Sequence, residues 1–225
     1  MSSKHDRHRG CYLLHARPYR ETSLLVRIFH REDGVIGAIA KGAATSRGLQ
    51  PFHPFSARIT GRSELKTLVA PEADASPWLL SDAVCLAGLY ANELVLASCA
   101  EQDGHPRLFD AYEQFLARLV DDGSSVAQQV ALRRFERVLF SEIGYELNYR
   151  ADAQDQAISP GNHYRLGDDW MFVPTPQGPY PGSSLLAMAA DDYSGAETQQ
   201  SARALSRDLL KRMLGKPLNS WKIFA

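Results

Sequence analysis

The stretch SLLVRIFHREDGVIGAIA, residues 23–40, decides the fold of the N-terminal part of this chain. Its first eight residues alternate between two faces, with Leu24, Val26 and Ile28 on one face and Leu25, Arg27 and Phe29 on the other. Asp33-Gly34 is a hairpin signal, because glycine tolerates the positive φ that tight turns require. Residues 35–40 then supply a partner strand. The stretch therefore predicts a β-hairpin.

Three further short strands are expected on either side of this hairpin, over residues 12–16, 55–60 and 65–70. Five short strands in about 60 residues are too few for a sandwich, but they suit a small closed barrel. An SH3-like barrel and an OB-fold barrel have the same number of strands. Periodicity alone therefore leaves the type of barrel open.

After Pro71 the pattern changes to that of helices, expected over residues 83–100, 106–120, 126–143, 183–190 and 196–214. The first of these helices is apolar nearly all round, which predicts that it is buried among its neighbours. Residues 145–182 are rich in proline and glycine, so we expect an irregular insert there, with a hairpin of 163–166 and 170–173. The fold class is α+β, a five-stranded barrel followed by an all-α helical domain with an irregular insert.

The composition is that of an ordinary globular protein, with 225 residues of which 44% are hydrophobic and 23% charged. It excludes collagenous, low-complexity and wholly disordered chains. Three cysteines without CxxC spacing predict neither a zinc finger nor a disulfide framework, and they fit a reducing compartment. The apolar runs fall short of the ~20 residues of a membrane span, and no apolar segment follows the basic N-terminus. We expect a cytoplasmic protein with no membrane partner.

The formal net charge of −1 conceals an uneven distribution of charge. Residues 1–70 carry twelve Lys and Arg against five Asp and Glu, a net of +7, whereas residues 71–225 carry a net of −8. A basic part of this kind suggests contact with a polyanion. The charge alone is equally compatible with solubility or with docking between the two parts.

Basic residues of the predicted barrel, with one aromatic residue, form a candidate DNA-binding set. Its members are Arg17, Tyr19, Arg20, Arg27, Lys41, Arg47, Arg58 and Lys66. Arg17, Tyr19 and Arg20 are expected in the turn after the first strand, whereas alternation puts Arg27, Arg58 and Lys66 on the solvent face. Such a surface suits single-stranded nucleic acid, since cations neutralise phosphates while an aromatic ring stacks on bases. The alternative is an ordinary solvated face.

Arg133, Arg134 and Arg137 form a second basic cluster, in the helix expected at 126–143. Spacings of three and four residues predict that they lie on adjacent strips of one surface. A local cationic patch in an acidic domain would select a short acidic ligand, such as a chain terminus. The alternative is pairing within the chain, with Glu136 or Glu93.

No catalytic or metal-binding set stands out. The chain has no phosphate-binding loop, nucleophile elbow, HExxH or GxGxxG motif, and its histidines are scattered singly. The acidic pairs at 121–122, 168–169 and 191–192 fall in expected loops, where carboxylates usually cap helices or face solvent. A small hydrolase that uses these carboxylates remains a distant alternative, and we expect neither metal nor cofactor.

Seven stretches stand in the order found in one known family. They are LLHARPYRETSLLVRIFHREDGVIGAIAKGA (13–43), LQPFHPF (49–55), GRSELKTL (61–68), GLYANEL (88–94), LFDAYE (108–113), ALRRFERVLFSEIGYEL (131–147) and GKPL (215–218). They cover most of the chain, and RPYxETS together with AKGA and LQPF is a specific combination. On these stretches the chain resembles RecO, the bacterial recombination-repair mediator family.

The resemblance implies an OB-fold barrel at 10–78, a mobile basic tail at 1–9, and a helical domain at 79–225 that carries the insert at 145–182. It implies a protein without catalytic activity or cofactors that binds single- and double-stranded DNA and anneals strands. It also implies action with RecR to exchange single-strand-binding protein for RecA, in the cytoplasm at the nucleoid. In the family, the helix matching ALRRFE helps to hold the acidic C-terminal tail of single-strand-binding protein, which points to Arg133, with Arg134 beside it.

Three departures from the family pattern affect these expectations. The insert at 145–182 contains no cysteine, which is similar to the zinc-free branch, so packing alone is expected to hold its shape. The loop after Lys41-Gly42 carries only one cation, Arg47, where relatives carry several. The tail has Asn219 and Trp221 where the family usually has basic residues. The short loop keeps open a second function, that of a helical adaptor that binds protein partners without DNA contact.

Overall fold

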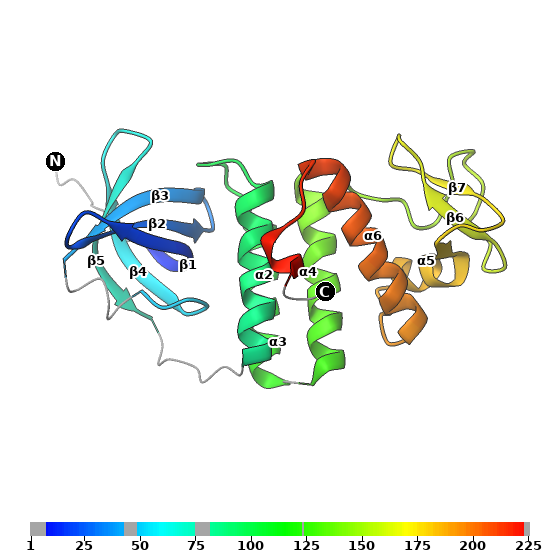
Figure 1. Ribbon diagram of the computed structural model, residues 1–225, viewed down its shortest axis with the longest axis horizontal. Helices are drawn as coiled ribbons and strands as arrows, with labels where there is room; N and C mark the ends of the chain where they lie inside the picture. Colours follow the sequence, from blue (N-terminus) through cyan, green and yellow to red (C-terminus); the bar gives the residue numbers. More distant parts are fainter. Residues whose placement is uncertain (1–7, 43–48, 75–81, 123, 223–225) are drawn as a thin grey trace.

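The computed structural model describes residues 8–42, 49–74, 82–122 and 124–222. The barrel lies at one end of the longest axis, a layer of helices follows, and a small sheet with a short helix lies at the other end (Figure 1). Most of the predicted basic tail and the candidate residue Arg47 lie outside the described residues. The first strand already begins at His8.

The barrel has five strands: β1 (His8–Tyr19), β2 (Ser23–His30), β3 (Gly34–Lys41), β4 (Pro54–Thr60) and β5 (Lys66–Ala73). They close in the order β1-β2-β3-β5-β4, and β4 pairs with β1. All neighbours are antiparallel except β3 and β5, which are parallel. This Greek-key order is that of the OB-fold. It settles the barrel type that periodicity left open.

The first strand is longer than predicted, and this changes the position of two candidate residues. Arg17 and Tyr19 lie within β1, paired with Leu25 and Ser23, and only Arg20 lies in the turn, with a φ of 56°. The expected end at residue 16 was wrong because Pro18 does not stop the strand. Beyond Leu13, which also bridges to Pro51, the described pairs of β1 are with β2 alone, so the strand is an edge there and tolerates a proline.

The two faces of the β2–β3 hairpin enter two different cores. Val26 and Ile28 point into the barrel, where they pack with residues such as Phe55 and Leu68. Phe29, on the opposite face, is fully buried in a second core that continues into the helices. The predicted alternation of the hairpin is therefore confirmed, but both of its faces bury apolar residues.

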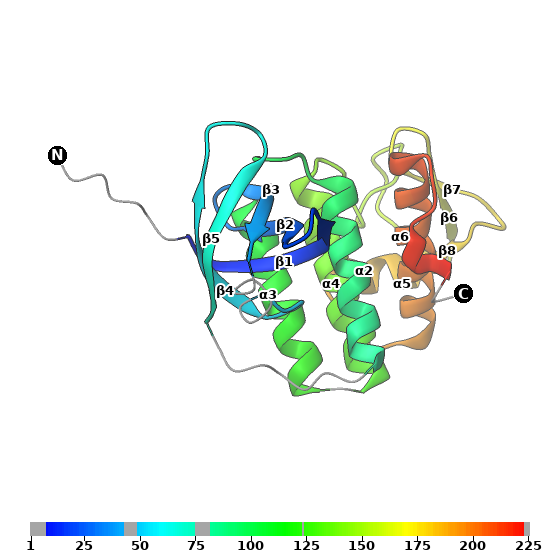
Figure 2. The same ribbon diagram turned by 60° about the vertical axis from the view of Figure 1, so that its left-hand side comes forward.

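An aromatic cluster joins the barrel to the helices, which Figure 2 shows side by side. The ring of Tyr12 lies 5.6 Å from Phe109 and 5.2 Å from Tyr112, and Phe29 lies 5.3 and 5.8 Å from the same two rings. The buried Asn92 side chain donates to the carbonyl oxygens of β1 at its bulge and accepts from the Tyr112 hydroxyl. Such satisfied polar contacts in a packed core fix the barrel against the helices.

The helices are α2 (Asp82–Ser98), α3 (Pro106–Asp121), α4 (Ser125–Glu142), α5 (Gly182–Ala189) and α6 (Ala196–Leu214), with a short 3-10 helix, η1 (Asn219–Lys222). All five helix predictions are confirmed to within a few residues. Gly144 and Gly215 have φ values of 86° and 63° just after α4 and α6, the left-handed conformation typical of helix ends. The expected all-round burial of α2 is wrong, since Leu89 is 46% exposed. The neighbours of α2 contact its other sides.

The insert forms a three-stranded sheet in the order β7-β6-β8, from β6 (His163–Leu166), β7 (Phe172–Pro174) and β8 (Tyr180–Pro181). The predicted hairpin is confirmed, with its second strand starting two residues later than expected. The two-residue strand β8 is too short to give a periodic signal.

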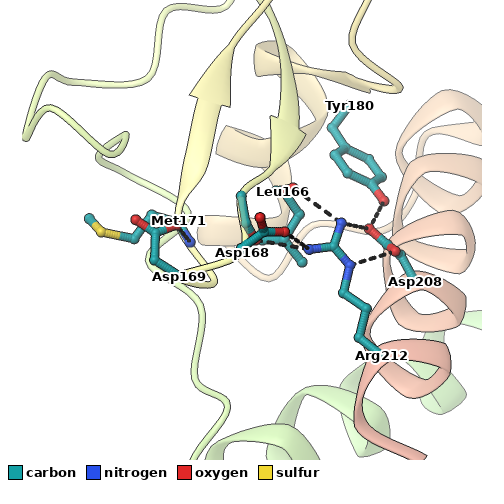
Figure 3. A network of polar contacts seen from close by, with 8 residues as sticks. Leu166, Asp168, Asp169, Met171, Tyr180, Asp208 and Arg212 are labelled. Atoms are coloured by element: carbon teal, nitrogen blue, oxygen red, sulfur yellow. Dashed lines mark hydrogen bonds and ion pairs between the residues drawn. The ribbon is translucent and has the colours of Figure 1, made fainter. Parts of the chain in front are cut away.

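Polar contacts, besides packing, fasten the insert to α6 (Figure 3). Arg212 donates to the carbonyl oxygens of Leu166 and Gly167, at 3.2 and 2.9 Å, and to both carboxylate oxygens of Asp208. Tyr180 donates to the same carboxylate at 3.3 Å. The expectation that packing alone holds the insert was therefore incomplete, because a bidentate guanidinium pair is both strong and directional.

Candidate nucleic-acid and peptide interfaces

The outer face of β1–β2–β3 carries four of the candidate DNA-binding residues, and three of them, Arg17, Tyr19 and Lys41, lie in two neighbouring rows. The register puts Arg17 in one row with Leu25 and Ile39, and Tyr19 in the next row with Ser23 and Lys41. Arg17 and Lys41 are exposed. No ion pair or side-chain hydrogen bond involves either of them within the described part of the chain. They are open cations on one surface.

Arg20 extends this surface from the β1–β2 turn. Its guanidinium lies 5.2 Å from the centre of the Tyr19 ring, a cation–π contact. Tyr19 is half-buried and Arg20 is exposed. The pair offers an aromatic ring next to a cation, which is the combination that stacks a base beside a neutralised phosphate.

Arg58 and Lys66 lie apart from that surface. Arg58 is exposed on β4, paired with Val69 of β5. Lys66 pairs with the interior residue Ala38 and stands two residues before the buried Leu68. Because side chains alternate along a strand, Lys66 starts the inward row at the rim of the barrel, where it is half-buried. Its predicted place on the solvent face was wrong.

Arg27 faces outward as predicted, but it is paired within the chain. Its guanidinium forms an ion pair with the carboxylate of Glu101, in the segment between α2 and α3. Among the described members of the set, only Arg27 is tied by an ion pair to the helical part, 74 residues further along the chain. Sequence reasoning had no signal for this contact.

A cavity of about 250 Å³ lies among α2, α4, α6 and η1. We call it the arginine cavity. The residues that define it here are Leu86, Tyr90, Leu132, Arg133, Arg203, Arg207 and Trp221. Its apolar walls come from α2, α4 and η1, and its three guanidinium groups come from α4 and α6. In Figure 1 the red C-terminal segment crosses in front of α4 towards α2, with which η1 is in contact.

Arg133 is held at the wall of this cavity by a buried carboxylate. Its guanidinium lies 2.9 Å from Glu136, which is 1% exposed. The two oxygens of Glu136 also accept hydrogen bonds from the hydroxyls of Tyr90, at 2.7 Å, and Ser206, at 2.6 Å. Burial and the nearby carboxylate raise the pKa of Tyr90, so its hydroxyl remains a donor. A fully hydrogen-bonded carboxylate of this kind fixes the direction of the guanidinium.

Arg203 and Arg207 bring two more cations to the same cavity. Partial burial, and then the charges of Arg207 and Arg133, lower the pKa of Arg203. Three guanidinium groups therefore gather around a cavity that no carboxylate lines among the described residues, and the Glu136 carboxylate behind it pairs with Arg133 and also acts on Arg203. Such a site favours an anion.

Trp221 closes one side of the cavity, and the C-terminal segment is fastened there by Glu93. The backbone amides of Asn219 and Ser220 donate to the two oxygens of Glu93, at 2.7 and 2.8 Å. Burial raises the pKa of Glu93, but these bonds outweigh it and lower the pKa below its ordinary value. The indole of Trp221 lines the cavity together with Tyr90 and acts to lower the pKa of Tyr90, against the larger effect of burial, and the Arg207 guanidinium lies 6.0 Å from the indole ring.

The three arginines of α4 do not all reach the arginine cavity. Arg134 pairs with Asp191 at 2.8 Å, and Arg137 donates to the carbonyl of Met188 at 2.6 Å. Both connect α4 to the end of α5, whereas only Arg133 reaches the arginine cavity. Neighbouring helical residues point about 100° apart, so Arg134 faces away from the arginine cavity. Arg137 lies beside each of the other two arginines, as its spacing predicts, but the end of α5 holds it. Pairing within the chain, the alternative, is confirmed for Glu136 but not for Glu93.

Sequence reasoning missed Arg203, Arg207 and Trp221. Two arginines four residues apart on α6 are a weak signal for a cationic helix face. Nothing in the sequence indicates that α6 and the C-terminal segment meet Arg133 of α4.

Two family models match consecutive parts of the chain. "Recombination protein O N terminal" matches residues 4–73 and "Recombination protein O C terminal" matches residues 83–222. The chain belongs to the RecO family. Curated relatives named "DNA repair protein RecO" include one from Cupriavidus metallidurans, 39% identical and covering 94% of this chain and 74% of its own length. Those of Cellvibrio japonicus and Dechloromonas aromatica are 37% and 34% identical, and each match covers 95% of this chain and over nine-tenths of the relative.

Membership of the RecO family gives this chain a role in DNA repair and recombination. Within the described residues of this RecO family member, no helix is long and apolar enough to cross a membrane. Over the same residues, no three His, Cys, Asp or Glu side chains gather in a way that could hold a metal ion.

Proposed function

We propose that this RecO family member is a recombination mediator that works without catalysis. It binds and anneals DNA through its barrel and receives the acidic tail of single-strand-binding protein in the arginine cavity. The observation that carries the proposal is the convergence of Arg133, Arg203 and Arg207 on an apolar cavity in the acidic part of the chain. Cleaving or joining DNA does not require a site of this kind. A protein that acts on DNA coated with another protein does require a site that binds the coating protein.

For DNA, the support comes from the open cations of the barrel. Arg17, Arg20 and Lys41 are exposed around Tyr19 on one side of the OB-fold. Phosphate contacts by such side chains give affinity without sequence preference, as strand annealing requires. Arg47 and Arg58 are proposed as further phosphate contacts. Lys66 at the rim contributes less, and the ion pair with Glu101 withholds Arg27 from phosphates.

For the tail, the support is the chemistry of the arginine cavity. A guanidinium offers a planar fork that grips a terminal carboxylate with two parallel hydrogen bonds. The surrounding residues 71–225 carry a net charge of −8 and would repel an acidic peptide elsewhere. Arg133, rather than Arg134 or Arg137, is therefore the residue of α4 that we assign to the tail, with Arg203 and Arg207 added.

The remaining features of the proposal follow from the family. Residues 10–78 would act as the DNA-binding unit, with 1–9 as a basic extension, and 79–225 would be the partner-binding domain. RecR would join the complex, and RecA would be loaded as a result. The protein would work in the cytoplasm at the nucleoid and would need neither cofactor nor metal.

The pairing of Arg27 and the inward turn of Lys66 favour a second candidate, an adaptor that binds protein partners without DNA contact. Titration of a labelled single-stranded oligonucleotide at several salt concentrations separates the two functions. Each phosphate contact on a single strand contributes about −0.7 to the log–log salt slope. A slope of about −2 or steeper supports the mediator, and salt-independent or absent binding supports the adaptor.

A further inference from the structure

Arg27 occupies a special place on the outer face of the barrel. The rows of this face run from Tyr19 and Lys41, through Arg17, to Arg27, and the next row holds Phe29, which the helices cover. Arg27 is therefore the last outward cation before the helical layer. In a surface that tracked a DNA strand along these rows, it would be the natural next phosphate contact.

A short acidic segment fixes the partner of Arg27 in place. We call residues 101–104 the strap. Its backbone forms a bridge between Glu101 and Val35, and the Gln102 amide donates to the Val35 carbonyl at 2.9 Å. The strap pairs with the first part of β3, ahead of Ala38. The described pairing of β3 with β5 begins at Ala38. The strap backbone also packs closely against the hairpin at Gly34. A Cβ at Gly34 would lie only 1.8 Å from the Asp103 carbonyl oxygen, so there is no room for a side chain there.

The strap carries the Glu101 carboxylate to the outer face of the sheet. It meets Arg27 above Gly37, where a Cβ would already lie 3.4 Å from Arg27 Nη1 and 3.6 Å from Glu101 Oε2. These are ordinary van der Waals distances, so the ion pair lies directly over Gly37 of β3. The side chains of Arg27 and Glu101 remain 35% and 42% exposed, so the pair is within reach of a ligand on this face.

We propose that Glu101 is a positioning residue that limits how far DNA extends along the barrel. It neutralises Arg27 and places a carboxylate at the end of the row of cations, so that phosphates stay on the rows of Arg17 and Lys41. Because the strap is bound through its backbone, the carboxylate is held there in the free protein. The inference rests on the proposed DNA binding by the barrel.

The salt slope of single-strand binding tests this directly, because it counts phosphate contacts. Glu101→Gln keeps the shape of the side chain and releases Arg27. It should tighten binding about threefold at low salt and make the slope steeper by about 0.7. Arg27→Gln alone should leave the slope of the parent unchanged. In the Glu101→Gln background, Arg27→Gln should return the slope to that of the parent.

Asp110→Asn is the matched control. Asp110 pairs with Arg31 at the helix-covered end of the hairpin and is exposed to a similar extent as Glu101. If Asp110→Asn steepens the slope as much as Glu101→Gln does, the effect is one of net charge and the inference is wrong. The inference is also wrong if Glu101→Gln leaves the salt slope unchanged. It is equally wrong if Arg27→Gln, made in the parent protein, makes the slope shallower. If the parent itself binds no oligonucleotide, the proposed function fails first and this inference with it.

Discussion

The barrel surface and the arginine cavity both present cations, but the structure holds these cations in different ways. Arg17, Arg20 and Lys41 project from separate rows and one turn of the barrel, exposed and independent of one another. Arg133 is buried at a cavity wall, and a carboxylate with two further hydrogen bonds fixes its direction. The first arrangement suits a long, uniform polyanion, and the second suits one short chain end.

The difference predicts different energetics. Exposed charge pairs are each worth about 0–1 kcal/mol and weaken with salt, so barrel binding depends on the number of contacts. Loss of one partner of a buried, hydrogen-bonded charge pair costs about 2–5 kcal/mol, so cavity binding depends on individual residues. Substitutions on the barrel should therefore change mainly the salt dependence of binding, whereas substitutions in the cavity should change mainly the affinity, and by a larger factor.

The largest effect is expected from Arg133→Ala. Affinity for an acidic tail peptide should fall by about tenfold or more, while binding of naked DNA stays as in the parent. Peptide titrations of both proteins, side by side, measure this loss. Arg134→Ala is the matched control, because Arg134 pairs with Asp191 outside the cavity and its loss should not change peptide affinity. Equal peptide affinities of parent and Arg133→Ala would move the partner site elsewhere.

A smaller loss is expected from Trp221→Ala. A ring-to-ring contact in the cavity is worth roughly 0.5–1.5 kcal/mol, so affinity for an acidic peptide that ends in phenylalanine should fall about fivefold. The same peptide ending in alanine should lose little, and Trp221→Phe should restore most of the affinity. Equal losses for both peptides would show that Trp221 acts only by supporting the fold of the cavity.

On the barrel, Lys41→Gln should change the salt dependence of DNA binding more than the affinity at any one salt concentration. One phosphate contact is lost, so the slope should become shallower by about 0.7, equally for all sequences. Lys211→Gln, at an exposed position on α6, is the control and should leave the slope unchanged. A loss confined to one DNA sequence would mean that Lys41 reads bases.

Removal of metal should have no effect on either region. Zinc requires about four nitrogen, sulfur or oxygen ligands in a tetrahedral array, and the insert, which contains no cysteine, is fastened by Arg212 instead. We expect dialysis against a chelator to leave DNA binding, peptide binding and the melting temperature as they were. One zinc per chain by elemental analysis after such dialysis would contradict this.

Local patterns predicted those parts of the fold that depend on neighbours in sequence. The alternation around Asp33-Gly34 predicted the hairpin, and the change of pattern after Pro71 predicted the five helices to within a few residues. The arginines of α4 show the limit of such reasoning. Their spacing describes one helix, but whether a side chain meets a cavity or a neighbouring helix depends on which elements pack around it.

The contacts that sequence reasoning missed all join distant parts of the chain. Glu101 meets Arg27 from 74 residues away, and Glu93 holds the backbone of Asn219 across 126 residues. Glu101 belongs to no quoted stretch, and Glu93, within GLYANEL (88–94), was expected only as a possible partner of the α4 arginines. Their roles arise from tertiary packing, which a pattern in one sequence does not contain.

The account rests on two separate anion sites, and competition between their ligands tests this most directly. A labelled single-stranded oligonucleotide is titrated with the parent protein, first alone and then with a saturating acidic tail peptide. Saturation is verified in the same sample by a second label on the peptide. We expect the affinity for the oligonucleotide to be unchanged, since the barrel rows and the arginine cavity lie on different elements. Displacement of the oligonucleotide by the peptide would show one shared anion surface and contradict the account.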